Sequence, residues 1–353
     1  MTTGASPQPD PYIAEAERRA REVERKVTRA HLKPPPKLTL SQWADRYGIL
    51  SSEASARPGP FSVAEAPYQR EPMDVVGDPA VPLVVLEWAS QVGKTQILTL
   101  HVCYIIDQDP GPILHVQPTL AMAETFSKDR VAPAIRDTER LRGKVADVRT
   151  RNSGNALLHK QFPGGQLAIG GANSPAGLAA RAIRYLHLDE VDRFPPSAGT
   201  EGRPSAVAES RTATFPNAKI IKSSSPTLEG FSEIDEPYQL SDQREYWVPC
   251  PHCRYEQRLV FGGRDLDHGL KWETLEGGEL HAYYVCEACG ATSEEADKRW
   301  MLAHGRWIAA HPERSVPGFR INALYSPFFT WFRLVTATRS SSSSSVAAGL
   351  RIA

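Results

Sequence analysis

The sequence has no long apolar run, no excess of charge of either sign and few cysteines. No stretch of about 18 apolar residues occurs, so no transmembrane helix is expected. The N-terminal segment lacks the apolar stretch of a secretory signal, which favours a cytoplasmic location. Lysine plus arginine and aspartate plus glutamate each number 41, a balance that argues against a general nucleic-acid coat protein but allows a local basic patch. The five cysteines are expected to be metal ligands or core thiols, because disulfides are rare in reducing compartments.

Short apolar runs alternate with helical stretches over much of the sequence. Apolar residues make up 41% of the chain, enough for a sizeable core, and 353 residues suggest two domains or one domain with an insertion. A continuous run such as VPLVVL is typical of a parallel strand that is covered on both faces. The alternation therefore predicts an open parallel α/β sheet. Its strands are expected at 81–86, 112–116, 167–170, 185–188 and 220–223, and its helices at 94–107 and 120–137.

Changes in composition divide the chain into five predicted parts. A charged helical stretch at 12–32 favours a solvated surface helix over a DNA-binding arm. The second part should begin with a short helix at 40–47, with Ser41 as its N-cap, and an extended segment at 51–72. Six consecutive serines near the end predict disorder. The parts are a disordered or helical arm at 1–36, an α/β domain at 37–240, a cysteine-bearing insertion at 241–310, the end of the α/β domain or a lid at 311–335, and a low-complexity tail at 336–353.

The segment LEWASQVGKTQ follows the first predicted strand and opens the first helix, which is the setting of a phosphate-binding loop. Gly93 would let the backbone approach the phosphates of ATP, Lys94 would reach the β and γ phosphates, and Thr95 would bind Mg²⁺. Trp88 stands where the motif has its first glycine, so a chance Gly-Lys-Thr sequence is the alternative. The residues expected to hold the phosphates are Gln91, Val92, Gly93, Lys94, Thr95 and Gln96.

A second strand ends in two acids, in the segment RYLHLDEVDRF. Asp189 would hold Mg²⁺, and Glu190 would orient and deprotonate the attacking water. The alternative is a strand that ends in solvated acids, but the separation of about 95 residues from Gly-Lys-Thr suits a sheet with intervening crossovers. The two motifs together predict a nucleotide hydrolase.

A third apolar strand runs into small hydroxylated residues, in the segment KIIKSSSPT at 219–227. In a nucleotide-driven motor, such a strand end can sense the γ phosphate and relay hydrolysis to the part that grips DNA. An ordinary serine-rich turn is the alternative, because the pattern is not specific by itself.

Two cysteine pairs, CPHC at 250–253 and CEAC at 286–289, predict a structural zinc site. Each pair forms a tight turn with two thiolates on one side of the metal, and two such turns complete a tetrahedron. Four unrelated thiols are the alternative, and a redox pair fits less well because there are two pairs. His252 is expected to be a turn residue and Cys103 a core thiol. The predicted zinc ligands are Cys250, Cys253, Cys286 and Cys289.

With these motifs in this order, residues 40–334 resemble the large terminase subunits of lambda-type phages. The most specific stretch is GANSPAGLAARAIRYLHLDEVDRFP, at 171–195. Terminase phosphate loops often lack the first glycine, which lessens the weight of Trp88. The other matching segments are PYQREPMD at 67–74, WASQVGKTQ at 88–96, FSKDRVAPAIRDT at 126–138, SSSPT at 223–227, the two cysteine pairs, and GFRINALYSPFFTW at 318–331.

The resemblance implies an ATP-hydrolysing motor that moves double-stranded DNA into a procapsid. The implied fold is that of the P-loop NTPases, of the RecA-like type with an additional strand and a catalytic glutamate (ASCE), with a zinc-ribbon-like insertion. The implied cofactors are ATP, Mg²⁺ and Zn²⁺. The implied partners are double-stranded DNA, a small terminase subunit, the portal and procapsid, and further copies of the chain in a ring, with no membrane.

The resemblance also implies roles for single residues. Lys94 and Thr95 match the lysine and threonine of the phosphate loop, and Asp189 and Glu190 match the metal-holding acid and the catalytic glutamate. Arg181 resembles an arginine that reaches the γ phosphate of a neighbouring subunit in related motors, with a surface salt bridge as an equal alternative. Two residues, Tyr68 and Gln69, are candidates for contact with adenine. The implied coupling residues are Ser223, Ser224, Ser225 and Thr227.

One departure from the family is large. Lambda-type subunits continue into a nuclease domain, whereas the family-like sequence here stops near Leu334 and no aspartate or glutamate follows Trp331. Two-metal DNA cleavage needs several converging carboxylates, so the chain is expected to stop before its nuclease domain and to lack endonuclease activity. Two alternatives to a packaging motor stay open. One is another P-loop nucleic-acid ATPase, such as a helicase, and the other is an inactive prophage remnant with a zinc-binding module.

Overall fold

The computed structural model describes residues 12, 15–16, 18–23, 37–55, 57–145, 156–174, 182–227, 232–263 and 266–340. The chain forms two compact units, Met1–Lys37 and Leu38–Ala353. The described residues of the first unit that fall within the predicted helix at 12–32 are helical. None of the helices in the described ranges has the length and apolar character needed to cross a membrane.

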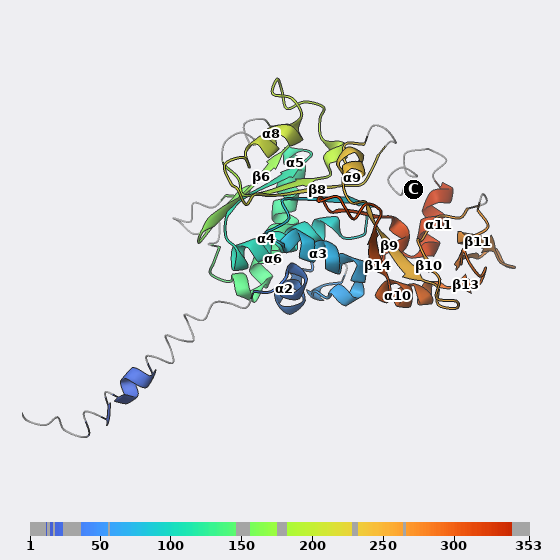
Figure 1. Cartoon of the computed structure of the whole chain (residues 1–353), viewed down its shortest axis with the longest axis horizontal. Helices are drawn as coiled ribbons and strands as arrows, with labels where there is room; N and C mark the ends of the chain where they lie inside the picture. The colour runs from blue at the N-terminus through green and yellow to red at the C-terminus, as the bar shows by residue number, and fades with distance from the viewer. Residues whose placement is uncertain are drawn as a thin grey trace, which may run out of the picture. The chain divides into compact units, whose positions relative to one another are not determined.

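A ten-stranded, mostly parallel sheet forms the centre of the second unit (Figure 1). Its strand order is β10-β9-β15-β3-β8-β7-β4-β6-β5, and β14 pairs with β9. The parallel pairs run without interruption from β9 to β6. The strands are β3 Leu83–Trp88, β4 Pro112–Gln117, β5 His159–Phe162, β6 Gly165–Gly171, β7 Tyr185–Asp189, β8 Lys219–Ser224, β9 Arg244–Pro249, β10 Glu256–Gln257, β14 Arg306–Ala309 and β15 Gly318–Ile321. The five predicted strands and the parallel α/β sheet are therefore confirmed.

Helices cover both faces of the sheet, and this explains the continuous apolar strands. Alternate side chains of β3 enter two separate cores, with Val84 and Leu86 in one and Val85 in the other. The first core includes Leu98 of α4, and the second includes Tyr238 of α9. Figure 1 shows α2, α3, α4 and α6 on one side of the sheet and α8 and α9 on the other. These helices are α2 Leu40–Tyr47, α3 Arg70–Gly77, α4 Lys94–Gln108, α6 Ala132–Asp137, α8 Pro204–Ser210 and α9 Asp235–Leu240.

The single helix predicted at 120–137 is interrupted. It consists of α5 (Leu120–Phe126), a π-helical turn η3 (Ser127–Val131) and α6. Pro133 lies in the first turn of α6 and has no N–H group, so it cannot donate the hydrogen bond that would continue a regular α-helix from α5. The wider turn brings Arg130 to the wall of a cavity described below.

Two predictions about the segment before β3 are wrong. The N-cap of α2 is Thr39 and not Ser41, because the hydroxyl of Thr39 accepts from the N–H of Gln42 while the Gln42 side chain accepts from Thr39 in return. The N–H of Ser41 donates to Asp74 instead. The segment at 51–72 is not extended throughout. It contains the short strand β2 Gly59–Pro60, which pairs with β1 Ile49–Leu50, the 3₁₀ turns η1 Val63–Glu65 and η2 Pro67–Gln69, and the start of α3.

The cysteine-bearing region is joined to the main sheet. Strands β9, β10 and β14 belong to that sheet, and β9 pairs in parallel with β15 through Phe319 and Arg320. A separate antiparallel sheet consists of β11 Gly269–Thr274, β12 Leu280–Val285 and β13 Thr292–Ser293. The helices that follow are α10 Glu295–Ala303, η6 Ala323–Tyr325 and α11 Trp331–Ser340. Helix α11 thus extends into the segment predicted as a tail.

Candidate nucleotide site and cysteine cluster

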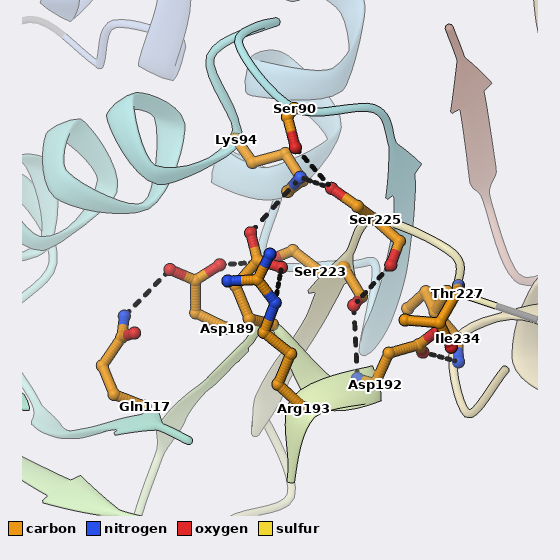
Figure 2. Close-up of polar contacts among 12 residues, drawn as sticks. Ser90, Lys94, Gln117, Asp189, Asp192, Arg193, Ser223, Ser225, Thr227 and Ile234 are labelled. Atoms are coloured by element: carbon orange, nitrogen blue, oxygen red, sulfur yellow. Dashed lines mark hydrogen bonds and ion pairs between the residues drawn. The ribbon is translucent and has the colours of Figure 1, made fainter. Parts of the chain in front are cut away.

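The three motifs singled out in the sequence meet at one edge of the sheet. Strands β3, β8 and β7 are neighbours in that order and run parallel, so their carboxyl ends lie side by side. The loop after β3, the acids at the end of β7 and the serines at the end of β8 therefore come together, as Figure 2 shows. Open α/β sheets bind ligands at this edge.

The loop between β3 and α4 is held from behind by buried side chains. Gly93 is the N-cap of α4 and has a φ of 98°, and a Cβ there would lie 2.2 Å from Nε2 of Gln69. The backbone conformation and the lack of space both require glycine. The carbonyl of Val92 accepts from the Tyr68 hydroxyl at 3.1 Å and from Gln69 Nε2 at 3.0 Å. Trp88, which replaces the first glycine of the motif, is fully buried in the core, so its side chain does not occupy the space of the loop.

Tyr68 and Gln69 thus lie against the loop, at 0% and 3% exposure. The Tyr68 ring packs edge-on against Trp88, with 5.8 Å between ring centroids. Their contact with adenine stays a prediction. Gln91 has a left-handed φ of 62° and an exposed side chain, and its carbonyl accepts from the Ser326 hydroxyl at 2.7 Å.

Lys94 connects the loop with the other two strand ends. Its Nζ donates to the carbonyls of Trp88 at 2.8 Å and Ala89 at 3.2 Å, and to the Ser225 hydroxyl at 2.7 Å. The Glu190 carboxylate lies 3.4 Å from the same nitrogen. Burial lowers the pKa of Lys94, and the neighbouring carboxylates oppose that shift.

Asp189 is almost fully buried and accepts from three different elements. Its Oδ1 accepts from the Ser223 hydroxyl at 2.7 Å, and its Oδ2 accepts from Gln117 Nε2 at 2.9 Å and the Thr95 hydroxyl at 3.4 Å. Glu190, the next residue, has a left-handed φ of 57°, which turns the chain out of the strand. Its Oε2 is buried and accepts no hydrogen bond from the described residues.

An open cavity of about 370 Å³ borders these side chains. The Thr95 hydroxyl and the Asp189 carboxylate are hard oxygen ligands of the kind that Mg²⁺ binds, and both line this space. The wall also carries two arginines, so the cavity can hold an anion and a cation together. The polar residues around it include Thr95, Gln117, Arg130, Asp189, Glu190 and Arg193.

A chain of buried histidines, not anticipated from the sequence, ends at Asp189. His101 Nδ1 lies 3.0 Å from His187 Nε2, His187 Nδ1 lies 3.5 Å from His115 Nδ1, and His115 Nε2 lies 2.8 Å from Gln117 Nε2. Burial lowers the pKa of each imidazole, to about 3 for His115, so all three are neutral near pH 7. Gln117 can donate to both His115 and Asp189. One set of histidine tautomers then forms every hydrogen bond in this row, with each imidazole donating to the next.

The sequence did contain a signal for this chain. His115 and His187 each interrupt an apolar strand two residues before its polar end, at Gln117 and Asp189. Side chains two residues apart on a strand lie on the same face, so each histidine is expected to lie beside the site.

The serine segment, residues 223–227, begins with the last two residues of β8 and contacts all the other parts of the site. Ser223 donates to Asp189, and Ser225 accepts from Lys94. Ser224 and Thr227 bind Asp192, a residue that the sequence reasoning did not single out. Arg181 lies outside the described residues, and its role stays a prediction.

The four cysteines of the two pairs gather in one cluster. The sulfurs of Cys250 and Cys289 are 3.9 Å apart, those of Cys253 and Cys286 are 3.8 Å apart, and all four lie within 4.8 Å of one another. Thiolates at the corners of a tetrahedron with metal–sulfur bonds of about 2.3 Å would be about 3.8 Å apart. The cluster therefore fits a metal ion held by four thiolates.

The two turns that carry these cysteines have the same backbone structure. In each, the carbonyl of the first cysteine accepts from the N–H of the residue after the second, at 3.0 Å for Arg254 and 3.1 Å for Gly290. Both of those residues have a φ of 67°. Cys103 lies apart from the cluster in the core at 1% exposure, as predicted, and burial raises its thiol pKa to about 12.

Comparison with known proteins identifies the family. The family model described as "Phage terminase large subunit gpA, ATPase domain" matches residues 55–307. The terminase large subunit of Enterobacteria phage P21 is 30% identical over 326 residues, which are 85% of this chain and 49% of that protein. The terminase large subunit of Escherichia phage lambda is 27% identical over 337 residues, which are 90% of this chain and 52% of that protein.

The chain thus spans about half the length of these two relatives. Among solved structures, the large terminase ATPase domain of Thermus phage P74-26 is 14% identical, with a TM-score of 0.42 and coverage of 78% of this chain and 89% of that one. The family assignment does not depend on this weak structural similarity. It follows from the family model and the two relatives that this chain belongs to the family of phage terminase large subunit gpA ATPase domains.

Proposed function

We propose that this chain hydrolyses ATP to move double-stranded DNA into a procapsid, on a P-loop NTPase fold of the ASCE type. The observation that carries the proposal is the position of β8 between β3 and β7, with its serines bonded to both neighbours. An additional strand between the phosphate-loop strand and the acidic strand is the arrangement that this type requires. The P21 and lambda relatives, both named as terminase large subunits, support the DNA-packaging role.

The phosphates of ATP would be held by the start of α4. Gly93 leaves the backbone open there, and the N–H groups of the loop and of the first turn of α4, at Gln91 to Gln96, favour an anion. Lys94 would exchange its present carbonyl and hydroxyl acceptors for phosphate oxygens. Thr95 and Asp189 would hold Mg²⁺, which neutralises charge on the phosphates when bound. The buried Oε2 of Glu190 would accept the proton of the attacking water.

The same contacts suggest how hydrolysis reaches the rest of the motor. Ser225 is bonded to Lys94 and Ser223 to Asp189, so two residues of the serine segment contact groups that ATP and Mg²⁺ would engage. When Lys94 donates to phosphate instead, the Ser225 hydroxyl loses this donor, and the hydrogen bonds at the end of β8 change. Ser223 to Thr227 would in this way sense the occupancy of the site.

The cysteine cluster would hold one structural zinc ion. Zinc is the metal most often found with four thiolates, and the S···S separations near 3.8 Å match its bond length. The cluster sits in the region that carries β9 and the small β11–β12–β13 sheet, at one edge of the main sheet. Zinc would therefore stabilise a zinc-ribbon-like subdomain and take no part in ATP chemistry.

The assembly around this chain is proposed on the resemblance and the relatives. Its partners would be double-stranded DNA, a small terminase subunit, and the portal and procapsid, in the cytoplasm of the host. Several copies would form a ring in which Arg181 of one subunit reaches ATP on the next. The division of the chain at 37–240, 241–310 and 311–335, and the lack of endonuclease activity, stay predictions.

ATP turnover by the purified chain tests the proposal. With Mg²⁺, the parental chain should hydrolyse ATP, whereas Lys94→Ala should lose both turnover and nucleotide binding. Lys128→Ala, which removes an exposed lysine on η3, is the matched control and should leave both unchanged. A parental chain that neither binds nor hydrolyses ATP would favour an inactive remnant. Strand separation of a DNA duplex, without uptake of DNA by procapsids, would favour a helicase.

A further inference from the structure

We propose that Asp192 is a positioning residue that joins the turn carrying Glu190 to the serine segment and to helix α9. This inference rests on the proposed function and deepens it. Asp192 lies in the 3₁₀ turn η5, Val191–Arg193, two residues after Glu190. It is not among the residues that line the cavity beside Thr95 and Asp189.

Asp192 makes five hydrogen bonds, all to the last residue of β8 or to residues that follow β8. Its Oδ2 accepts from the Thr227 N–H at 2.9 Å, the Thr227 hydroxyl at 3.0 Å and the Ser232 hydroxyl at 2.7 Å. Its Oδ1 accepts from the Ile234 N–H at 2.9 Å, and its own N–H donates to the Ser224 hydroxyl at 3.2 Å. Figure 2 shows the Asp192 side chain extending toward Thr227 and Ile234. One carboxylate thus binds both the end of the serine segment and the start of α9.

The backbone makes Asp192 responsive to Glu190. Glu190 holds a left-handed conformation with a φ of 57°, which is unfavourable for a residue with a side chain, and its carbonyl accepts from the N–H of Arg193 at 2.9 Å. Both ends of the turn are therefore fixed around Asp192. Because of this short closed turn, a shift of the Glu190 backbone must also move the Asp192 side chain.

The serine segment is consequently held by three separate parts of the site. Ser223 is bonded to the proposed Mg²⁺ ligand, Ser225 to the lysine of the loop, and Thr227 to the turn of Glu190. In this turn, Asp192 also accepts a hydrogen bond from the N–H of Ile234, the N-cap of α9. The described residues show no such bond from Ile234 to Asp189 or Lys94. Asp192 thus provides a hydrogen-bonded route by which a change at Glu190 would reach α9.

Helix α9 is in turn connected to the strand before the phosphate loop. Its first residue, Asp235, accepts from Arg320 at 2.9 Å, and the same guanidinium donates to Glu87 of β3 at 2.8 Å. Tyr238 of α9 packs in one core with Val85 of β3. A displacement of α9 would therefore act on β3, the strand that leads into the phosphate loop.

Asp192→Asn removes the proposed link with little change in size. A carboxylate accepts on both oxygens, but an amide has one acceptor and one donor group, so the N–H₂ must face an N–H or a hydroxyl that donated before. We expect kcat for ATP to fall about tenfold, while KM and the affinity for a non-hydrolysable ATP analogue stay within about twofold. Thr227→Val, which removes only the hydroxyl donor, should lower kcat about threefold. The double variant should be no slower than Asp192→Asn alone, because the two changes break one interaction.

The control is Asp74→Asn, which removes another half-buried carboxylate that accepts a backbone N–H, from Ser41, away from the site. It should keep parental kcat, and its melting temperature should match that of Asp192→Asn. Amide hydrogen exchange adds a direct readout. The ATP analogue with Mg²⁺ should alter exchange at Thr227 and Ile234 in the parental chain and in Asp74→Asn, but not in Asp192→Asn.

Parental kcat in Asp192→Asn, or an unchanged exchange response at Thr227 and Ile234, would overturn the role of Asp192 and leave the proposed ATPase intact. Lost nucleotide affinity together with a melting temperature well below that of Asp74→Asn would show that Asp192 only maintains the fold, and would also overturn it. If the parental chain binds no nucleotide, the proposed function fails, and this inference fails with it.

Discussion

The candidate nucleotide site at the edge of the sheet (the nucleotide edge) and the cysteine cluster are assembled in different ways. At the nucleotide edge, polar side chains from three strands and one helix come together, and Lys94 and Asp189 depend on partners from distant segments. At the cluster, two turns with the same backbone structure each supply two thiols. Loss of one partner should disturb chemistry at the first site and local folding at the second. Substitutions in each region should separate these two kinds of dependence.

The largest effect is expected at Asp189. Asp189→Asn should lower ATP turnover by at least about 100-fold, because it weakens the proposed Mg²⁺ ligand and places an amide against the donors Gln117 and Ser223. The melting temperature should change far less than the rate. Steady-state hydrolysis and thermal unfolding measure the two, with Asp109→Asn as a control outside the site. A variant that is unfolded but as active per folded molecule as the parent would contradict a chemical role.

A change at the cysteine cluster should have the opposite signature. Cys289→Ser should abolish binding of the one zinc per chain and speed amide exchange at 246–307, with ATP turnover retained within about threefold. Cys103→Ala is the matched control, since it alters a core cysteine and should keep the metal. Metal analysis of freshly purified protein checks both. Absence of any metal in the parental chain would contradict the zinc assignment. If ATP turnover falls in proportion to the zinc lost, the cysteine cluster and the nucleotide site depend on each other.

A smaller effect is expected from Gln117. Gln117→Leu removes the donor that connects the histidine chain to Asp189 and leaves His115 Nε2 without a partner. Turnover at low Mg²⁺ should fall about tenfold and recover in part at high Mg²⁺, because orientation of the metal ligand is lost and the ligand itself stays. The Mg²⁺ dependence of kcat measures this. Gln108→Leu on α4 is the control, and an unchanged Mg²⁺ dependence in Gln117→Leu would show that the histidine chain is only part of the core.

The smallest effect concerns the pH dependence of stability. Burial raises the pKa of Glu87 from 4.5 to about 7, against the opposing effect of Arg320, while Asp235 and Asp192 add to the rise. A raised carboxyl pKa favours folding below the unfolded value and loses that contribution as pH rises, here between pH 4.5 and 7. Relative to Glu87→Gln, the parental chain should therefore lose a few degrees of melting temperature over that range. A constant difference between the two chains across the range would contradict the raised pKa.

Much of the fold followed from local patterns in the sequence. The continuous apolar runs predicted the parallel strands, because both faces of β3 and its neighbours are covered. The cysteine spacing predicted the cluster, because each turn is formed within a few residues. Even the wrong N-cap was a local matter, since Thr39 and Gln42 form a capping box that the sequence contained.

The interactions that complete the nucleotide site were not predictable in the same way. Gln117 reaches Asp189 only because β4 lies beside β7, and Asp192 reaches Thr227 only because β7 lies beside β8. Strand order is a property of the whole sheet, and no local pattern specifies it. The pairing of β9 with β15 attaches the cysteine-bearing region to the main sheet. It joins residues about 75 positions apart in the sequence and was not predicted, for the same reason.

In the proposed mechanism, Glu190 accepts the proton of the water that attacks ATP. The most direct test compares the parental chain with Glu190→Gln, which keeps the size of the side chain but cannot act as a base. Nucleotide affinity and ATP turnover should be measured with Mg²⁺ in the same preparations. We expect parental affinity in Glu190→Gln and turnover at least about 100-fold below that of the parent. Hydrolysis of ATP by Glu190→Gln at the parental rate would show that Glu190 is not the base.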